Sequence, residues 1–322
     1  KGGKTINTIR QNEDKFEVAQ ALLDKTKLET ILNVKKAFYT FLLAAEFNHL
    51  NKGILENTYE HLNFLDARYK QGQASESDVL KIKESLSSVG EAYEASLNQA
   101  EAAQVLLKNL LYLEQAISIK PNTQFVYEPL EVAYDEAFLK AMQNRPEIRQ
   151  YEAQTQADKK AIEIAKADNR PNIYASWDYY SRSHISATTT KGRNDYNIVG
   201  LTFSWPIFDG WATKAKVEQA IIDLKETQLT KEKTIRDIVS ELKNAYLDLK
   251  NAIAKIKSAQ AQIGVYKDAL SVTEEKYKTG IVSSLDLNDV TLSYQVSLFN
   301  QKQAVYDYIV AKAQFDKATG GL

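Results

Sequence analysis

The sequence predicts a mainly α-helical protein with very long helices and one β-hairpin. All five prolines of the 322-residue chain lie between Pro121 and Pro206. Proline breaks helix interiors, so the two flanks without it, 1–120 and 207–322, can form unusually long helices. Between them, two short runs alternate apolar with small or polar residues, which is typical of strands.

Residues 1–115 are predicted to form two helices joined by a turn, because they repeat the C-terminal part of the chain. A shift of 208 residues superposes Gly2 on Gly210, "YKQG" (69–72) on "YKTG" (277–280) and Ser75 on Ser283. No gap is needed over about 70 residues, and the turn and the following helix start match at one shift, which indicates a tandem duplication.

Residues 116–145 are predicted to connect the two copies. The segment "LEQAISIKPNTQFVYEP" (113–129) is expected to be irregular, with room for one short strand, and a short helix is expected at about 131–143. The next segment, 146–210, begins with a helix from Pro146, a residue that suits the first helical turn, to about Asp168.

The rest of that segment is predicted to be a β-hairpin. In "NIYASWDYY" (172–180) and "NIVGLTFSW" (197–205) the side chains alternate between an apolar and a more polar face, and a polar loop (181–195) separates the two runs. Two interpretations stay open. The hairpin packs on the helices of a soluble protein, or it belongs to a transmembrane barrel with its aromatic-girdled apolar face toward lipid.

Residues 211–322 are predicted to form two further helices. Seventeen positions from Ile221 to Tyr277 follow a strict 3,4 spacing and fourteen of them are apolar or Tyr, as in a coiled-coil seam. Gly280 suits a turn, and Ser283 or Ser284 suits the cap of a second helix from about 284 to 318. The pattern leaves open whether the chain reverses at Gly280 or only kinks.

Composition argues against several functions. Charge is balanced, with 41 basic and 42 acidic residues, so nothing favours nucleic-acid binding. There is no cysteine, no nucleophile motif and no phosphate-binding loop. The three histidines (His49, His61, His184) are scattered, and we expect solvated or packing roles for them. We therefore expect no enzymatic activity, no cofactor and no metal.

The order of these elements resembles the TolC-like outer-membrane efflux and secretion channel family over essentially the whole chain. "LKAMQNRPEIRQYEAQ" (139–154) is similar to that family's start-of-repeat pattern. "NRPNIYASWDYY" (169–180) and "LTFSWPIFDG" (201–210) resemble its two strands. "ARYKQGQASESDVL" (67–80) and "EKYKTGIVSSLDLNDV" (275–290) resemble its two tip motifs.

The resemblance implies a trimeric α/β-barrel. Each subunit of such a homotrimer gives four strands to a shared twelve-stranded transmembrane β-barrel and long antiparallel coiled-coil helices to a periplasmic tunnel. This sequence departs from that plan, because "KGGK" (1–4) aligns with "DGW" (209–211). We expect that the first-repeat hairpin and its leading helix, at least about 65 residues by comparison with the second copy, are missing from a trimmed chain.

The resemblance also implies roles for the tip turns. Asp286 and Asp289 are expected to form rings of carboxylates at the pore entrance, which attract cations, with Tyr277 taking part in closure. The alternative is that these are ordinary first-turn acids stabilised by the helix dipole. Val282 replaces a basic partner that helps to lock the entrance in some relatives, which puts that lock in doubt. The residues expected to contact an adaptor are Tyr69, Gly72, Ser75, Gly280 and Ser283.

The expected function is that of an outer-membrane channel of a Gram-negative bacterium, with a large periplasmic part. It would be a passive conduit for drugs, other small molecules or polypeptides, working with a periplasmic adaptor and an inner-membrane transporter. The residues expected to face outer-membrane lipid are Trp177, Tyr179, Leu201, Phe203 and Trp205. The alternative is a soluble periplasmic coiled-coil scaffold or adaptor, which explains the seam but neither the hairpin nor the repeat.

Overall fold

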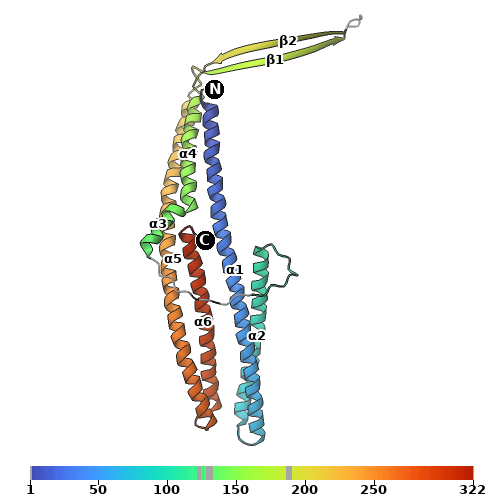
Figure 1. Ribbon diagram of the computed structural model, residues 1–322, viewed down its shortest axis with the longest axis vertical. Coiled ribbons are helices and arrows are strands. Elements are labelled where there is room, and N and C mark those ends of the chain that lie inside the picture. The colour runs from blue at the N-terminus through green and yellow to red at the C-terminus, as the bar shows by residue number, and fades with distance from the viewer. Residues whose placement is uncertain (1, 122–124, 126, 128–132, 186–190, 322) are drawn as a thin grey trace. The chain divides into compact units, whose positions relative to one another are not determined.

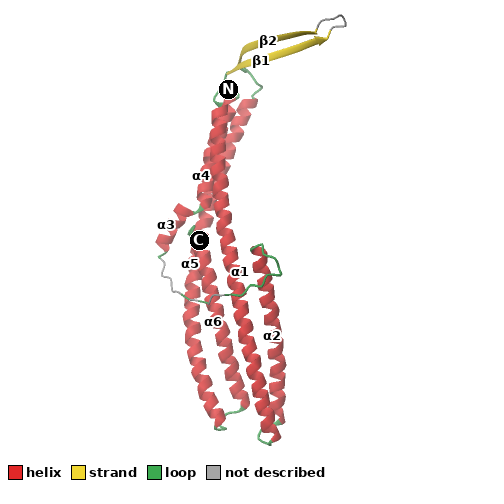
Figure 2. Ribbon diagram, turned by 45° about the vertical axis from the view of Figure 1, so that its right-hand side comes forward, coloured by secondary structure: helices red, strands yellow, loops and turns green. Residues whose placement is uncertain are grey.

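The computed structural model describes residues 2–121, 125, 127, 133–185 and 191–321. Within these residues the chain forms long helices and one antiparallel pair of strands, as predicted (Figures 1 and 2). The elements are α1 (Lys4–Lys70), α2 (Glu76–Leu110), α3 (Tyr134–Asn144), α4 (Pro146–Ala167), β1 (Asn172–Ile185), β2 (Lys191–Ser204), α5 (Ala212–Lys278) and α6 (Ser284–Ala318).

The helices repeat along the chain. Both α1 and α5 have 67 residues, and both α2 and α6 have 35. The starts Lys4 and Ala212 differ by 208, as do the starts Glu76 and Ser284. The gap-free duplication inferred from the sequence therefore extends to the boundaries of these four helices.

The chain reverses between α5 and α6, which decides the question that the sequence left open. Lys255 on α5 pairs with Asp307 on α6 at 3.4 Å, and Glu241, earlier on α5, pairs with Lys317, later on α6, at 3.0 Å. Residue numbers thus rise along one helix and fall along the other. The two helices form an antiparallel hairpin.

The chain divides into two compact units, and the second contains most of the buried apolar residues. It comprises Thr26–Asn144 and Ile238–Leu322. Its main core combines the predicted seam of α5 with α6 and α3, and the seam residues buried there are Leu242, Ala245, Leu249, Ala252, Ile256 and Ala259. Their many alanines let the helices approach closely. A separate cluster joins α1 to α2 through Phe41, Ala103 and Leu107.

The first unit comprises Lys1–Lys25 and Arg145–Asp237. In it α4 is joined to both long helices. Arg149 pairs with Asp24 on α1 at 2.8 Å, and Glu152 pairs with Lys231 on α5 at 3.0 Å. Pro146 occupies the first turn of α4, as its fixed φ favours.

Some predicted boundaries need correction. The strands extend to Ile185 and from Lys191, so the predicted polar loop (181–195) is too long, because strand pairing depends on backbone groups rather than on apolar side chains. Of that loop, 186–190 lie outside the described residues. The second strand ends at Ser204 rather than at Trp205. Trp205 precedes Pro206, which has no N–H to donate and so cannot continue the pairing.

In the connecting segment, the described residues of 113–129 form no strand, and the others lie outside the description. The short helix predicted at 131–143 is α3, which begins at Tyr134, and 131–132 are not described. Among the described helices, none combines the length and the apolar character that crossing a membrane requires.

Candidate functional site

The turn between α5 and α6 is held by backbone and side-chain hydrogen bonds. Gly280 has a φ of 75°, the left-handed conformation that glycine adopts without strain. Its N–H donates to the Tyr277 carbonyl at 3.0 Å, and the Ile281 N–H donates to the Lys276 carbonyl at 2.9 Å. This Schellman-type arrangement satisfies carbonyls at the end of α5.

Ser283 then caps α6. Its hydroxyl oxygen accepts a hydrogen bond from the Asp286 N–H at 3.1 Å. Asp286 Oδ2 in turn accepts from the Ser283 N–H at 3.0 Å and from the Ser283 hydroxyl at 2.8 Å, which completes a capping box. These hydrogen bonds, that of the hydroxyl first, lower the pKa of Asp286.

The first tip, between α1 and α2, has a similar turn and a capping serine, but of the two tips, both within the described residues, only the second forms a complete capping box. Gly72 has a φ of 71°, and its N–H donates to the Tyr69 carbonyl at 2.9 Å. Ser75 caps α2: its oxygen accepts from the Asp78 N–H at 3.1 Å, and its hydroxyl donates to Asp78 Oδ2 at 2.8 Å. The predicted turn glycines and capping serines thus have equivalent places in both repeats.

The two candidate gating acids, Asp286 and Asp289, are both exposed in the first turns of α6. The contacts of Asp286 with Ser283 use Oδ2, so its cap role and a role of the carboxylate toward solvent are compatible. The sequence alternatives, a first-turn acid and a pore carboxylate, therefore do not exclude each other.

The structure adds His61 to the second tip. This half-buried histidine of α1 lies with its ring centroid 6.4 Å from that of Tyr277 and with Nε2 3.3 Å from the Ser284 hydroxyl oxygen. Burial lowers the pKa of His61. The sequence shows only a lone histidine far from "YKTG", so this contact was not predictable. His49 is exposed, and the side chain of His184 lies outside the description.

Two grooves flank the tips of the second unit. One lies between α2 and α6, and its lining includes Asp78, Lys81, Ser284, Asn288 and Leu292. The other lies between α1, α5 and α6, and its lining includes Gly53, Asn57, Leu270, Tyr294 and Leu298. Neither groove is lined by a group of three or more His, Cys, Asp or Glu side chains that could hold a metal ion, and the described residues contain no such group.

The register of the hairpin puts most of the apolar residues of both strands on one face. The pairs on that face are Ile173 with Phe203, Ala175 with Leu201, and Trp177 with Val199. The opposite face pairs Tyr174 with Thr202, Ser176 with Gly200, and Asp178 with Ile198. Large apolar side chains of the first face are exposed. Tyr179 lies farther along the same face, whereas Trp205 directly follows the strand.

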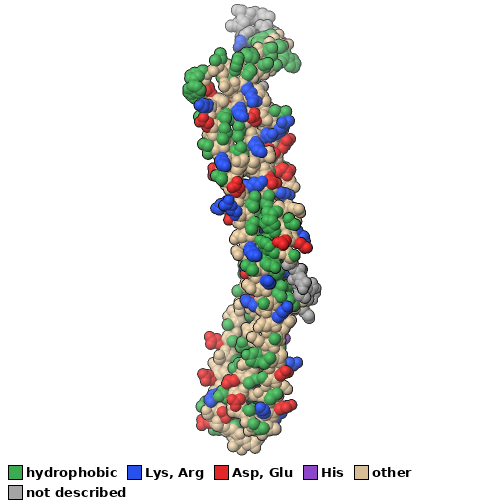
Figure 3. All heavy atoms as spheres, turned by 90° about the vertical axis from the view of Figure 1, so that its left-hand side faces the viewer, with side chains coloured by type: hydrophobic (Ala, Val, Ile, Leu, Met, Phe, Trp, Pro, Cys, Tyr) green, Lys and Arg blue, Asp and Glu red, His purple; other side chains and the backbone are tan. Residues whose placement is uncertain are grey.

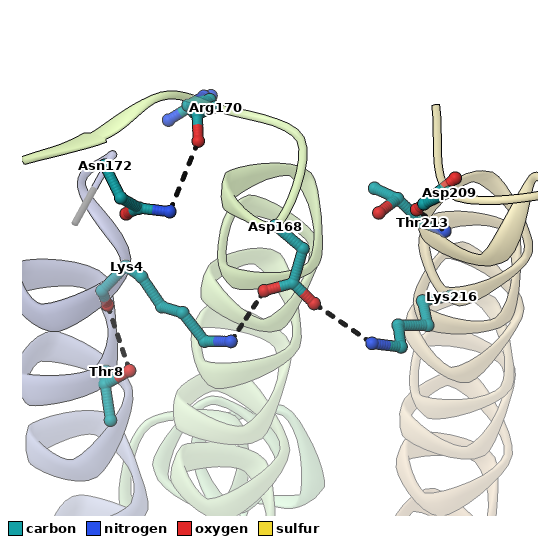
Figure 4. Close-up of polar contacts among 8 residues, drawn as sticks. All are labelled: Lys4, Thr8, Asp168, Arg170, Asn172, Asp209, Thr213 and Lys216. Atoms are coloured by element: carbon teal, nitrogen blue, oxygen red, sulfur yellow. Dashed lines mark hydrogen bonds and ion pairs between the residues drawn. The ribbon is translucent and has the colours of Figure 1, made fainter. Parts of the chain in front are cut away.

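A second feature not predicted from the sequence lies where the strands meet the helices. Asp168, at the end of α4, accepts hydrogen bonds from Lys4 of α1 at 2.6 Å and from Lys216 of α5 at 3.1 Å (Figure 4). Asp209 accepts from the N–H of Thr213 at 2.8 Å and so caps the start of α5. The hydrogen bond from Lys4, and after it the one from Lys216, lowers the pKa of Asp168. Lys4, Asp168 and Lys216 form an ion triad that joins three helices next to the hairpin.

These features define a protein of duplicated helical hairpins with capped tips and a two-faced β-hairpin. The chain belongs to the outer membrane efflux protein family, whose model matches residues 1–111 and 139–321.

Individual relatives are distant in sequence but close in fold. The alkaline protease secretion protein AprF of Pseudomonas aeruginosa is 23% identical over 308 residues, which cover 92% of this chain and 63% of AprF. The chain therefore spans less than two thirds of the length of this relative. A crystal structure of a membrane protein from Pseudomonas aeruginosa shares the fold with a TM-score of 0.85 and 19% identity, over 99% of this chain and 73% of that one. The Campylobacter jejuni CmeC outer membrane channel gives a TM-score of 0.81 and 19% identity, over 99% and 68% of the two chains.

Proposed function

We propose that the chain is part of an outer-membrane channel subunit that conducts small molecules or polypeptides out of the periplasm. The observation that carries this proposal is the strand register, which gathers exposed apolar side chains of both strands on one face. Exposing such an apolar face to water is unfavourable in free energy, whereas contact with lipid chains is not. Family membership and the names of the relatives, a secretion protein and an outer membrane channel, support the same function.

The subunit acts as a passive conduit in a homotrimer of the Gram-negative outer membrane, with its helices in the periplasm. Long helices with buried alanine-rich seams suit the wall of a tunnel. No chemical step is required of such a wall, and energy comes from an inner-membrane transporter coupled through a periplasmic adaptor. The cargo is a drug, another small molecule or a polypeptide.

Two tasks fall to the tips, gating at the second tip and adaptor binding at both. Asp286 and Asp289 are exposed near the end of the helical hairpin, and three copies of each would make rings of negative charge that attract cations. Tyr277, next to them, takes part in closure. The adaptor binds at the turns Tyr69–Ser75 and Tyr277–Ser283, where the α2/α6 groove offers both charged and apolar lining.

The full-length protein tests this function directly. We expect it to require detergent for extraction, to have the mass of a trimer, and to form ion-conducting pores in planar lipid bilayers. A protein that stays monomeric and soluble without detergent would instead be the coiled-coil scaffold, and the channel proposal would be wrong.

A further inference from the structure

The connection between β2 and α5 exposes an unusual amount of apolar surface. It runs from Trp205 to Trp211, and we call it the junction loop. The exposed fractions of its large side chains are 56% for Trp205, 89% for Ile207, 75% for Phe208 and 68% for Trp211. Figure 3 shows hydrophobic side chains gathered where the helices meet the hairpin, whereas charges of both signs are interspersed along the helices. Four large apolar side chains in seven residues need a covering partner.

Trp211 also has a strained backbone. Its φ is 68°, in the left-handed region, where a side chain with a Cβ is disfavoured. The residue before it, Gly210, has a φ of 65° without such strain. A tryptophan in this conformation is worse for local folding than glycine, so a reason for it has to be sought in something that the side chain does.

The first repeat shows what the backbone alone prefers at this position. At the shift of 208 residues, Gly210 corresponds to Gly2 and Trp211 to Gly3. Both glycines have positive φ angles, 49° and 84°. The same left-handed pair therefore precedes α1 and α5, and only the second repeat carries an aromatic residue in it.

The chemistry around Trp211 points to a lipid headgroup region. Its ring makes an edge-to-face contact with Phe208 at 6.1 Å between centroids, and the Lys214 ammonium lies 5.6 Å from the Trp211 ring centre. The Lys214 side chain is 67% exposed and is 4.0 Å from Glu218. Tryptophan beside lysine is typical of membrane–water interfaces, where the ring lies among headgroups and the amine meets phosphate.

The junction loop also continues the surface that the proposed function assigns to lipid. Phe203 and Leu201 lie on the apolar face of β2 directly before it. On its other side, the triad of Lys4, Asp168 and Lys216 marks the first polar layer of the helices (Figure 4). The loop thus lies between an apolar surface and a charged one.

We propose that the junction loop is an interfacial anchor for the phospholipid leaflet that faces the periplasm. Ile207, Phe208 and Trp211 insert among its headgroups and upper acyl chains, and Lys214 pairs with lipid phosphate. This inference rests on the proposed function, because it needs the hairpin to be in the membrane. It goes further by assigning a lipid-binding role to a strained connection outside the strands.

Site-directed quenching tests the anchor, and the absence of cysteine from this chain makes single labelling sites possible. Trp211→Cys, Leu201→Cys and Lys233→Cys are each made in the full-length protein and labelled with a bimane fluorophore. The proteins are placed in nanodiscs of phosphatidylethanolamine and phosphatidylglycerol that contain nitroxide-labelled lipid. Lys233 is an exposed residue of α5 well beyond the junction loop and serves as the negative control.

We expect strong loss of fluorescence from the labels at 201 and 211 and little loss at 233. Quenching at 201 without quenching at 211 overturns the anchor and leaves the channel intact. Absence of quenching at 201 contradicts the membrane position of the hairpin, and the anchor fails with it.

A second comparison separates lipid binding from packing against another subunit. Trp211→Gly restores the residue type of the first repeat, so we expect an unchanged or higher melting temperature of the trimer in detergent. Transfer from detergent to the anionic nanodiscs should raise the melting temperature of Trp211→Gly less than that of the wild type. Lys214→Gln should reduce the difference in melting temperature between phosphatidylglycerol and phosphatidylcholine nanodiscs. A lower melting temperature or loss of trimer for Trp211→Gly in detergent would show that the loop contacts protein, which overturns the proposal.

Discussion

His61 Nε2 lies 3.3 Å from the hydroxyl oxygen of Ser284, although 223 positions separate the two residues in the chain. The contact joins α1 of the first repeat to the first residue of α6 in the second repeat. The ring of His61 also meets that of Tyr277, so one histidine touches both sides of the second tip turn. A substitution of His61 should therefore change the packing of the second tip turn, which is the candidate entrance.

The first prediction concerns pH. Burial lowers the pKa of His61 from its usual value of 6.5, because the folded tip favours the neutral ring. Between the folded and the unfolded pKa of His61, the unfolded tip therefore binds more protons than the folded tip. Stability of the tip is therefore complete above the unfolded pKa and falls as pH drops toward the folded value. Hydrogen exchange of the first turns of α6, corrected for intrinsic rates, should show easier opening at about pH 5.5 than at about pH 7.5. His61→Gln should lose this dependence, and persistence of the dependence in that variant would assign it to another group.

The second prediction concerns the ion triad. Asp168→Asn removes the charge that pairs with Lys4 and Lys216, and we expect a loss of about 1 kcal/mol from the free energy of unfolding, since the pairs are partly exposed. Because the folded pKa of Asp168 is lowered, its contribution is present above the usual value of 3.8 and is lost as pH falls through the folded value.

Thermal unfolding of the full-length protein checks the effect of Asp168→Asn. The variant should melt below the wild type at neutral pH, and the two should converge in acid. Asp223→Asn, at an exposed position of α5 in the same unit, is the matched control. An equal effect of the control would mean that general surface charge, and not the triad, is responsible.

The third prediction concerns the helix caps. Ser75→Ala and Ser283→Ala each remove the oxygen that accepts from the third residue of a helix, at a cost of about 1 kcal/mol to the local helix start. Hydrogen exchange of the first turns of α2 and α6 should become faster, each only at its own tip. Thr at either position keeps a hydroxyl that can accept from the backbone N–H and donate to the Asp carboxylate, so it should largely restore protection. Slower or unchanged exchange in the alanine variants contradicts the capping role.

The fourth prediction concerns ion selectivity. Asn at 286 keeps an oxygen that can accept from Ser283 but removes the charge, so Asp286→Asn with Asp289→Asn should lower cation selectivity in planar bilayers without unfolding the tip. Asp78→Asn is the matched control, because Asp78 has the same contact with its capping serine at the other tip. Equal changes in both proteins would show that the carboxylates of α6 have no special place at the entrance.

Local patterns predicted the helices well. The proline-free flanks, the apolar seam and the glycine and serine of each turn are properties of short stretches, and the second long helix, expected at about 212–277, is Ala212–Lys278. The duplication supported the same helices in the first repeat, because its turn and cap residues match those of the second at one shift of 208 residues. Strand alternation also predicted the apolar face, since side chains two residues apart must share a face.

Long-range and conformational features were not predictable in the same way. The contact of His61 with Ser284 depends on how two hairpins pack, which no local pattern encodes. The triad at Asp168 brings together residues from three helices. The strain at Trp211 follows from a φ angle that a single sequence does not reveal, although the repeat did contain a signal: Trp211 corresponds to a glycine, Gly3.

The equal lengths of the repeated helices restrict how this protein can change in evolution. The contacts of α1 with α6, such as Glu46 with Lys302 at 2.8 Å and Phe47 with Phe299 at 4.9 Å between ring centroids, hold the two repeats in one register. A deletion of one or two turns in α1 alone would shift every contact beyond it and leave His61 facing a different partner. Natural variants with longer or shorter hairpins should therefore carry matched insertions or deletions in all four long helices. The lengths of these helices should be preserved more strictly than their sequences when the repeats recombine.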